Sequence, residues 1–257
     1  LAALLFLAAC SDSEEQAVAQ APPVEVVRVE GERVVERIQA TGDLIPREEM
    51  VVTVTHGGYI KRVPLSTFRA QRRGGKGRAG MTTHAEDFVT GVHVVNTHTP
   101  VLFFSSRGMV YRLKVYRVPL GSPQSKGRAM VNLLPLAEGE TISTLMPMPE
   151  EGLEGRSVVF ATSNGTVRRN RLSDFASVMA NGKIAMKLSD GNRLIGVAPC
   201  SDKDDVLLAT RGGKGIRFDV NDVRTFTGRD SEGVSGIRLG DGDEVMSVSI
   251  LRHVDFG

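Results

Sequence analysis

The sequence predicts an all-β fold, a propeller-like array of about four hairpin blades. Four runs of β-branched, aliphatic and aromatic residues begin near residues 51, 101, 158 and 206, and each leads into a glycine. Such runs, repeated at a spacing of roughly 50 residues, are typical of propeller-like arrays. Only residues 172–179 suggest an amphipathic helix. We therefore expect the strands of the 257-residue chain to supply its core.

The first feature that repeats in register is a β-hairpin. Its turn is marked by Gly58, Gly108, Gly165 and Gly213. Because glycine takes the positive φ angles of a tight turn without steric cost, an apolar strand is expected before each glycine and a return strand after it. Four residues after each glycine stands an arginine: Arg62, Arg112, Arg169 and Arg217. We expect these cations to share one surface and to form a continuous anion-binding stripe.

A second glycine-containing loop follows each hairpin. It holds Gly77, Gly127, Gly182 and Gly233, and lysines flank the first three at Lys76, Lys126 and Lys183. Short apolar segments come next, at residues 129–134, 184–188 and 234–239. We expect these segments to form the strands that close each hairpin unit.

The loop of the first repeat is strongly basic. Residues 61–80 contain seven cations and no acidic residue: Lys61, Arg62, Arg69, Arg72, Arg73, Lys76 and Arg78. Within this stretch, Gln71-Arg72-Arg73-Gly74-Gly75-Lys76-Gly77 combines charge with glycines, whose backbone can lie close to a partner and offer its N–H groups to phosphate oxygens. Stacking aromatics are scarce, since the chain has no Trp and only three Tyr. The pattern favours contact with the phosphates of duplex DNA over single-strand base stacking.

The first 42 residues differ from the rest. They carry three arginines against seven acidic residues, a net charge of −4, whereas the remainder carries +6. Residues 1–10 are an apolar segment that resembles the end of a bacterial lipoprotein signal peptide, with Cys10 as the residue to be lipidated. Residues 11–42 form an acidic linker that resembles the start of periplasmic adaptor proteins. We expect this leader to be largely disordered or a short helix, and the third region to span 43–257.

The glycine-rich stretches, histidines, aspartates and cysteines of the sequence do not indicate a nucleotide, metal or catalytic site. The two Gly-Gly-Lys-Gly stretches, at 74–77 and 212–215, lack the spacing and the following Ser or Thr of a phosphate-binding P-loop. The five histidines show no metal-ligand spacing, and the aspartates at 202–205 and 241–243 are typical of turns. With Cys10 lipidated, Cys200 has no cysteine to pair with. We predict no metal site, no catalytic residue and no specific small-molecule ligand.

Residues from about 49 to 257 closely resemble the C-terminal domain of DNA gyrase A subunits. The stretch 71–77 matches the seven-residue gyrase A box of that family without a substitution, and residues 51–62 and 97–108 are also similar to it. The resemblance implies a β-pinwheel that wraps duplex DNA, so that the whole enzyme introduces negative supercoils with ATP and Mg²⁺ bound on other domains. It implies as partners the gyrase A breakage–reunion domain and gyrase B, in a heterotetramer, and implies action in the cytoplasm at the nucleoid.

The resemblance and the repeat together suggest one set of DNA-binding residues. They are Gln71, Arg72, Arg73, Gly74, Gly75, Lys76, Gly77, Arg78, Lys61, Arg62, Arg69, Arg112, Lys126, Arg128, Arg168, Arg169, Lys183 and Arg217.

Two departures from the family limit what this chain is expected to do. The family has six blades and about four are predicted here, so we expect an open sheet edge; the breakage–reunion core is missing, so we expect the segment itself to be non-catalytic. The envelope-type leader conflicts with a cytoplasmic body and is interpreted as foreign or misjoined. Two alternatives stay open: the related domain of topoisomerase IV, whose box is degraded, and a lipid-anchored adaptor fragment fused to a propeller-like binding module.

Overall fold

The computed structural model describes residues 44–68, 80–83, 86–149, 151–179, 181–228 and 231–254. The chain divides into two units, Leu1–Asp43 and Leu44–Gly257, and only the second contains described residues. The leader with Cys10, the box residues 71–77, Arg69 and Arg78 therefore lie outside them. What is described consists of strands and short 3-10 helices, so the predicted all-β class is confirmed.

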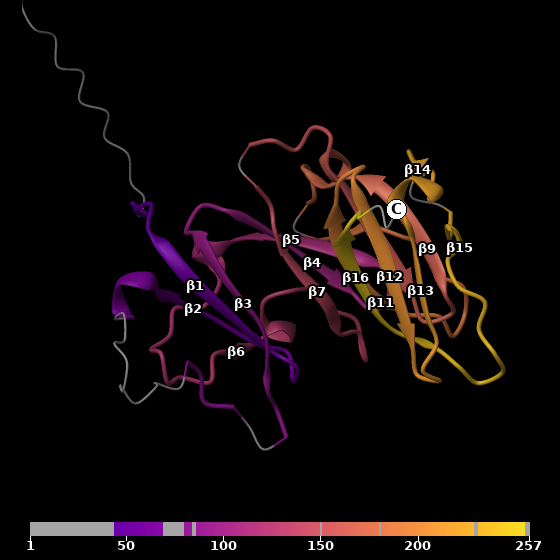
Figure 1. Cartoon of the computed structure of the whole chain (residues 1–257). Coiled ribbons are helices and arrows are strands. Elements are labelled where there is room, and N and C mark those ends of the chain that lie inside the picture. Colours follow the sequence, from indigo (N-terminus) through magenta and orange to yellow (C-terminus); the bar gives the residue numbers. More distant parts are fainter. Residues whose placement is uncertain are drawn as a thin grey trace, which may run out of the picture. The chain divides into compact units, whose positions relative to one another are not determined.

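Four hairpins form the first two strands of the four blades (Figure 1). The turn glycines Gly58, Gly108, Gly165 and Gly213 have φ angles of 81°, 75°, 84° and 80°, as the sequence predicts. Positive φ explains why these turns need glycine. The hairpins are β1(Glu49–Thr55)–β2(Tyr59–Pro64), β4(Pro100–Ser105)–β5(Met109–Lys114), β8(Ser157–Thr162)–β9(Thr166–Arg171) and β12(Asp204–Thr210)–β13(Gly215–Asp219).

A third strand completes each repeat on the other side of the first strand. These strands are β3(Val89–Asn96), β7(Ile142–Pro147), β11(Leu194–Cys200) and β16(Val245–Arg252), and all pair antiparallel. The register shifts near the turn end of every pair, for example between Val54 and Thr55 and between Ala209 and Thr210. The same bulge in each repeat indicates one structural unit used four times.

The fourth strand of a blade comes from the following repeat, which differs from our expectation. β6(Arg128–Ala129) pairs with β2, β10(Lys183–Ile184) with β5, and β14(Thr225–Phe226) and β15(Val234–Ser235) with β9 (Figure 1). We call β6, β10 and β15 the arm strands. The segments predicted to close their own units thus form strands of only two residues and complete the preceding blade. Among the described strands, none adds to the free edge of β13, so the fourth blade has three strands.

The core lies between consecutive blades. One cluster joins blades one and two around Ile60 and Phe103, a second joins blades two and three, and a third joins blades three and four around Val206. In the second cluster, the rings of Phe104 and Phe160 pack edge to face, with centroids 5.6 Å apart. Each blade therefore depends on its neighbours for burial.

The helix predicted at 172–179 is shorter than expected. Residues Leu172–Phe175 form a single 3-10 turn, which buries its two apolar ends in the second cluster. Four further 3-10 turns connect strands: Leu65–Thr67, Val115–Arg117, Met130–Asn132 and Val220–Asp222. Within the described ranges, no helix has the length and apolarity needed to cross a membrane.

Candidate nucleic-acid interface

The four predicted arginines occupy one position of the repeat. Each lies on the second strand of its hairpin, opposite an equivalent apolar residue of the first strand. The pairs are Arg62 with Val52, Arg112 with Leu102, Arg169 with Val159 and Arg217 with Leu207. Backbone position is thus shared, as the spacing predicts.

The surroundings of these arginines are not shared, and the continuous exposed stripe is not found. Nε of half-buried Arg62 donates to the Val118 carbonyl at 2.7 Å. Arg169 is buried, with a side chain ion-paired to Asp202. Nε of Arg217 donates to Asp205 at 2.6 Å. These three guanidinium groups therefore bind protein groups, because packing between repeats decides which cations reach solvent.

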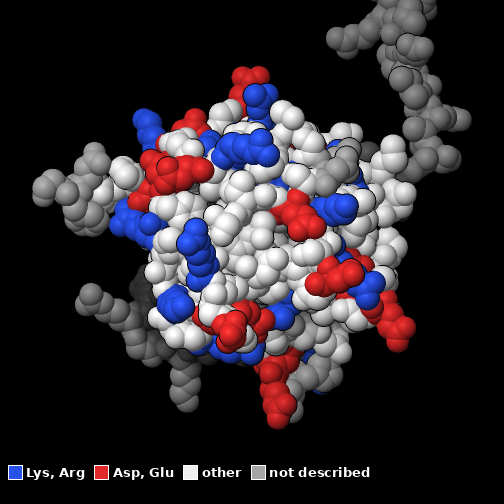
Figure 2. Space-filling view, turned by 90° about the vertical axis from the view of Figure 1, so that its right-hand side faces the viewer, with Lys and Arg blue, Asp and Glu red and all other residues white. Residues whose placement is uncertain are grey.

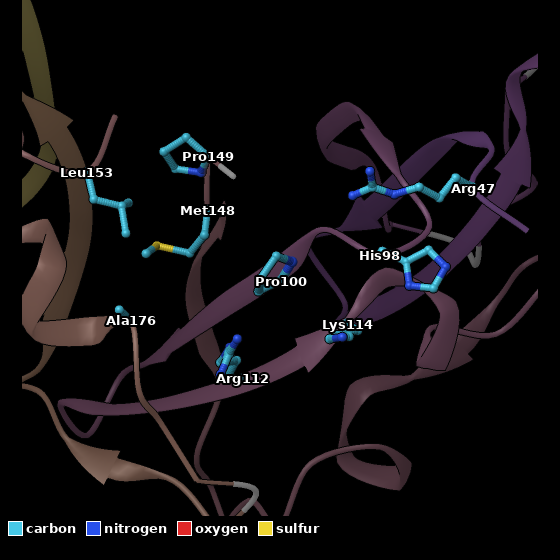
Figure 3. A pocket seen from close by; sticks show the side chains of 9 residues that line it. All are labelled: Arg47, His98, Pro100, Arg112, Lys114, Met148, Pro149, Leu153 and Ala176. Atoms are coloured by element: carbon cyan, nitrogen blue, oxygen red, sulfur yellow. The ribbon is translucent and has the colours of Figure 1, made fainter. Parts of the chain in front are cut away.

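Arg112 differs from the other three. It is half-buried, and its side chain makes no hydrogen bond or ion pair with any residue that the structure describes. It lines a cavity of about 610 Å³ together with Lys114, Arg47 and His98 (Figure 3). The remaining lining residues are uncharged: Pro100, Met148, Pro149, Leu153 and Ala176. The lining of the cavity therefore includes basic side chains and no carboxylate.

This cavity contains cations that the sequence reasoning missed. Lys114 is exposed two residues after Arg112 on β5, and Arg47 is exposed just before β1. Nε2 of His98 lies 2.9 Å from the Ile45 carbonyl oxygen, which connects the segment before β1 to the cavity rim. Alternation along β5 was the available signal, since residues two apart on a strand point to the same face.

Lys61 and Arg168 are not surface cations, which corrects two of the predicted sites. Both are fully buried, at 0% exposure. Nζ of Lys61 donates to the carbonyls of Ser122, Pro123 and Ser125 at 3.0, 2.6 and 3.0 Å, and burial lowers its pKa. Arg168 donates to the Gly228 and Ser231 carbonyls. The two side chains hold the segments that lead to the arm strands, because each buried cation is satisfied by backbone carbonyls of such a segment.

The other predicted cations are placed as follows. Lys126 and Arg128 are exposed, at the arm strand β6. Lys183 is half-buried, and its Nζ donates to the Asp174 carbonyl at 3.3 Å. Exposed Lys126 and Arg128 are available to an anion, whereas Lys183 already has a protein acceptor.

A cluster that spacing did not indicate lies at the end of β16. Asp205 is a buried residue of β12, not of a turn, and its carboxylate lies 2.6 Å from Nε of Arg217 and 2.7 Å from Nδ1 of His253. The hydrogen bond to His253, with that to Arg217, lowers the pKa of Asp205. A carboxylate oxygen of Asp219 lies within 4.8 Å of a carboxylate oxygen of Asp205 and of a ring nitrogen of His253. Because Arg217 already supplies the cation, the cluster is an ion-pair network.

Charge on the side of β13 and β15 is mixed. Figure 2 shows Lys and Arg interspersed with Asp and Glu around an uncharged central area. Arg211 and Arg193 both form ion pairs with Glu244. This face gives no support to a continuous basic stripe.

A family model described as "DNA gyrase C-terminal domain, beta-propeller" matches residues 49–96, 99–147, 156–201 and 204–252. The chain belongs to this family. Each matched segment contains the three long strands of one blade. The predicted family is therefore confirmed over the four repeats.

Sequence relatives and solved structures agree with this family assignment. The chain is 52% identical over 214 residues to the DNA gyrase A protein of Rickettsia bellii and 47% over 210 residues to that of Escherichia coli K12, each covering 82% of this chain. It spans about a quarter of these relatives' length, 24%. A DNA gyrase A C-terminal domain structure matches with a TM-score of 0.58 and 26% identity, over 78% of this chain and 64% of that one. The structure of a topoisomerase IV C-terminal domain matches with a TM-score of 0.67, over 82% of this chain and 63% of that one. Its sequence identity is 22%, so this match supports only the fold.

Cys200 has the environment of a core residue. It is a buried free thiol, and burial raises its pKa to about 11. A thiol with so high a pKa is a poor nucleophile at neutral pH. We assign it no chemical role.

Proposed function

We propose that the β-propeller of this chain binds the phosphate backbone of duplex DNA and is the DNA-wrapping part of a gyrase A protein. The observation that carries the proposal is the cavity lined by Arg112, Lys114 and Arg47 without a carboxylate, on a domain of the gyrase family. Several cations gathered around one cavity attract phosphate.

The proposed DNA surface has two parts. The first is the cavity with the exposed cations Lys126 and Arg128. The second is the box, Gln71–Gly77, with Arg69 and Arg78, which the sequence alone suggests. The proposed surface does not include the buried cations Lys61, Arg168 and Arg169. It also omits three cations that bind protein groups: Arg62, Lys183 and Arg217.

Binding of this kind depends on backbone contact and bending. Tyr111 is buried and the chain has no Trp, so few aromatic side chains are available to stack on bases. Smooth bending of a 20–30 bp site costs on the order of 1–6 kcal/mol, which many phosphate contacts must offset. We infer recognition of DNA shape and charge.

The activity of a whole gyrase is proposed at the level of the assembly. In it, the breakage–reunion domain of gyrase A and gyrase B would cleave and pass DNA, using ATP and Mg²⁺, while this domain presents the wrapped segment in the cytoplasm. The curated relatives with 47–53% identity are gyrase A proteins. This observation, with the intact box, favours gyrase over topoisomerase IV.

The test is DNA affinity across a salt series. Counterion release gives a slope of log K against log salt of roughly −0.9 per phosphate contact. Replacing Arg112→Gln with Lys114→Gln is expected to make the slope shallower by about two contacts. Lys203→Gln, at an exposed turn of the fourth blade, is the matched control and should leave it unchanged. Salt-independent binding, or equal slopes for the double variant and the original chain, would contradict the proposal.

Wrapping itself needs a separate measurement in a complete gyrase. The pair Arg72→Ala and Arg73→Ala, introduced at the equivalent box positions, is expected to abolish wrapping in a topology assay while sparing much of the simple DNA binding. Unchanged topology would remove the box from the proposed surface.

A further inference from the structure

The cavity beside β5 has two sides of different chemistry. Arg47 and His98 lie on one side of it (Figure 3). Met148 and Leu153 lie on the other, which we call the apolar wall, and Arg112 lies between the two sides. A phosphate of DNA can use the cations, but it has little apolar surface to place against the apolar wall. The proposed function therefore leaves half of the cavity without a role.

The apolar wall is held in place by the protein core. Met148 is only 4% exposed and belongs to the second core cluster, and its backbone N–H donates to the Pro100 carbonyl at 2.8 Å. Leu153 packs against the same cluster. Because both side chains are already packed, a ligand that contacts them has little ordering entropy to overcome.

Arg112 and Lys114 supply the charge between the two sides. They stand two residues apart on β5, so their side chains point to the same face of the strand. The guanidinium group of Arg112 can offer two parallel N–H donors to a carboxylate, sulfonate or phosphate group. No described lining residue is acidic, so an arriving anion meets no like charge in the lining.

The cavity has the size and composition of a small-molecule site. Its volume is about 610 Å³, and ligand pockets usually measure about 300–1,000 Å³ and combine apolar walls with a few charged groups. We propose that it binds a small organic anion with an apolar body, the anionic group at Arg112 and Lys114 and the body against the apolar wall. The sequence does not predict this ligand, because the lining residues are spread from position 47 to position 176.

Such an anion competes with DNA for the same cations. The proposed function assigns Arg112 and Lys114 to the phosphate backbone, and one guanidinium group cannot hold both anions in the same geometry. The cavity is thus a place where an organic anion lowers the affinity for DNA. This competition rests on the proposed function, whereas binding of the organic anion does not.

Fluorescence titration of the full chain with anilinonaphthalene sulfonate, in the absence of DNA, tests the inference. This probe joins a sulfonate to an apolar body and brightens in apolar surroundings, and it should bind at one saturable site. Arg112→Gln should weaken binding by about two- to fivefold, as for a partly exposed ion pair. Leu153→Gln should weaken it by at least about threefold, because apolar contact area is lost.

Two control variants are matched to these substitutions in chemistry. Arg117→Gln removes an exposed cation of the same blade, one that lines a neighbouring cavity of about 240 Å³. Val131→Gln changes an apolar residue that is 61% exposed and does not line the cavity. Both variants should bind the probe like the original chain.

Folding is checked separately, because a chain that has lost its tertiary packing also binds this probe. Near-ultraviolet circular dichroism should show the same packing in each variant as in the original chain. If Leu153→Gln loses it, Ala176→Gln replaces that variant, since Ala176 lines the cavity and is exposed. It should weaken probe binding by placing a polar side chain in the cavity.

The outcomes separate this inference from the proposed function. Equal affinities of the original chain and the folded cavity variants would overturn the inference, as would an equal loss in Arg117→Gln, which would place the probe in the neighbouring cavity. Added duplex DNA should displace the probe at low salt, and co-binding of both would overturn the competition. If only the proposed function fails, DNA affinity will ignore Arg112 and Lys114 while the probe still responds to Arg112→Gln.

Discussion

Nζ of Lys61 lies 2.6 Å from the carbonyl oxygen of Pro123, a residue 62 positions later in the chain. The same ammonium group also binds the carbonyls of Ser122 and Ser125, so it fixes the loop that brings β6 to the first blade. Arg168 has the equivalent role toward the Gly228 and Ser231 carbonyls in the third blade. Cations at this position therefore stabilise the exchange of strands between repeats.

Replacing Lys61→Met is expected to destabilise the domain by about 1–3 kcal/mol, because three backbone carbonyls lose the charged donor that holds their loop. The free energy of unfolding from urea denaturation measures the loss. Lys126→Met, at an exposed lysine of the same loop, should change stability by less than about 0.5 kcal/mol. Equal effects of the two substitutions would remove the special role of Lys61.

Gly233→Ala is expected to cost at least about 1 kcal/mol, from strain at positive φ and from contact with the acceptor strand. The φ angle is 105°, and the new Cβ would lie 2.3 Å from the Val167 carbonyl oxygen. Thermal unfolding compares it with Gly228→Ala, where an added Cβ meets nothing within 4 Å. A midpoint unchanged by Gly233→Ala would show that the arm does not depend on this close approach.

Asp205 predicts how stability changes with acid. Its pKa is lowered by the hydrogen bond to His253 and the one to Arg217, so its contribution is present above the unfolded carboxyl pKa of about 3.9 and is lost as pH falls through the lower folded value. Asp205→Asn should lower the unfolding midpoint at pH 7 and flatten its fall in acid. Exposed Asp241→Asn is the control, and a pH profile for Asp205→Asn parallel to the original would refute the assignment.

Local chemistry made the repeat predictable. Glycines at 58, 108, 165 and 213 mark turns that require positive φ, and a fixed spacing after them puts an arginine opposite the same first-strand position each time. The box and the neighbouring phrases indicated the family for the same reason, since they are contiguous in the sequence.

The spacing of the repeat did not predict which arginine is available to bind an anion. Arg112 and Arg169 occupy equivalent positions, yet Arg112 lines an open cavity and Arg169 is buried against Asp202. The partner acid is 33 residues away along the chain, and a spacing argument carries no information about it.

The sequence by itself thus determined the hairpin unit, its four copies, its turn glycines and its family, because these follow from backbone preferences and short contiguous motifs. The tertiary structure decided which blade each arm strand completes, which cations remain exposed and how Asp205 meets His253. Those outcomes depend on contacts between segments about 12 to 75 residues apart, and burial in such contacts is set by the packing of neighbouring repeats.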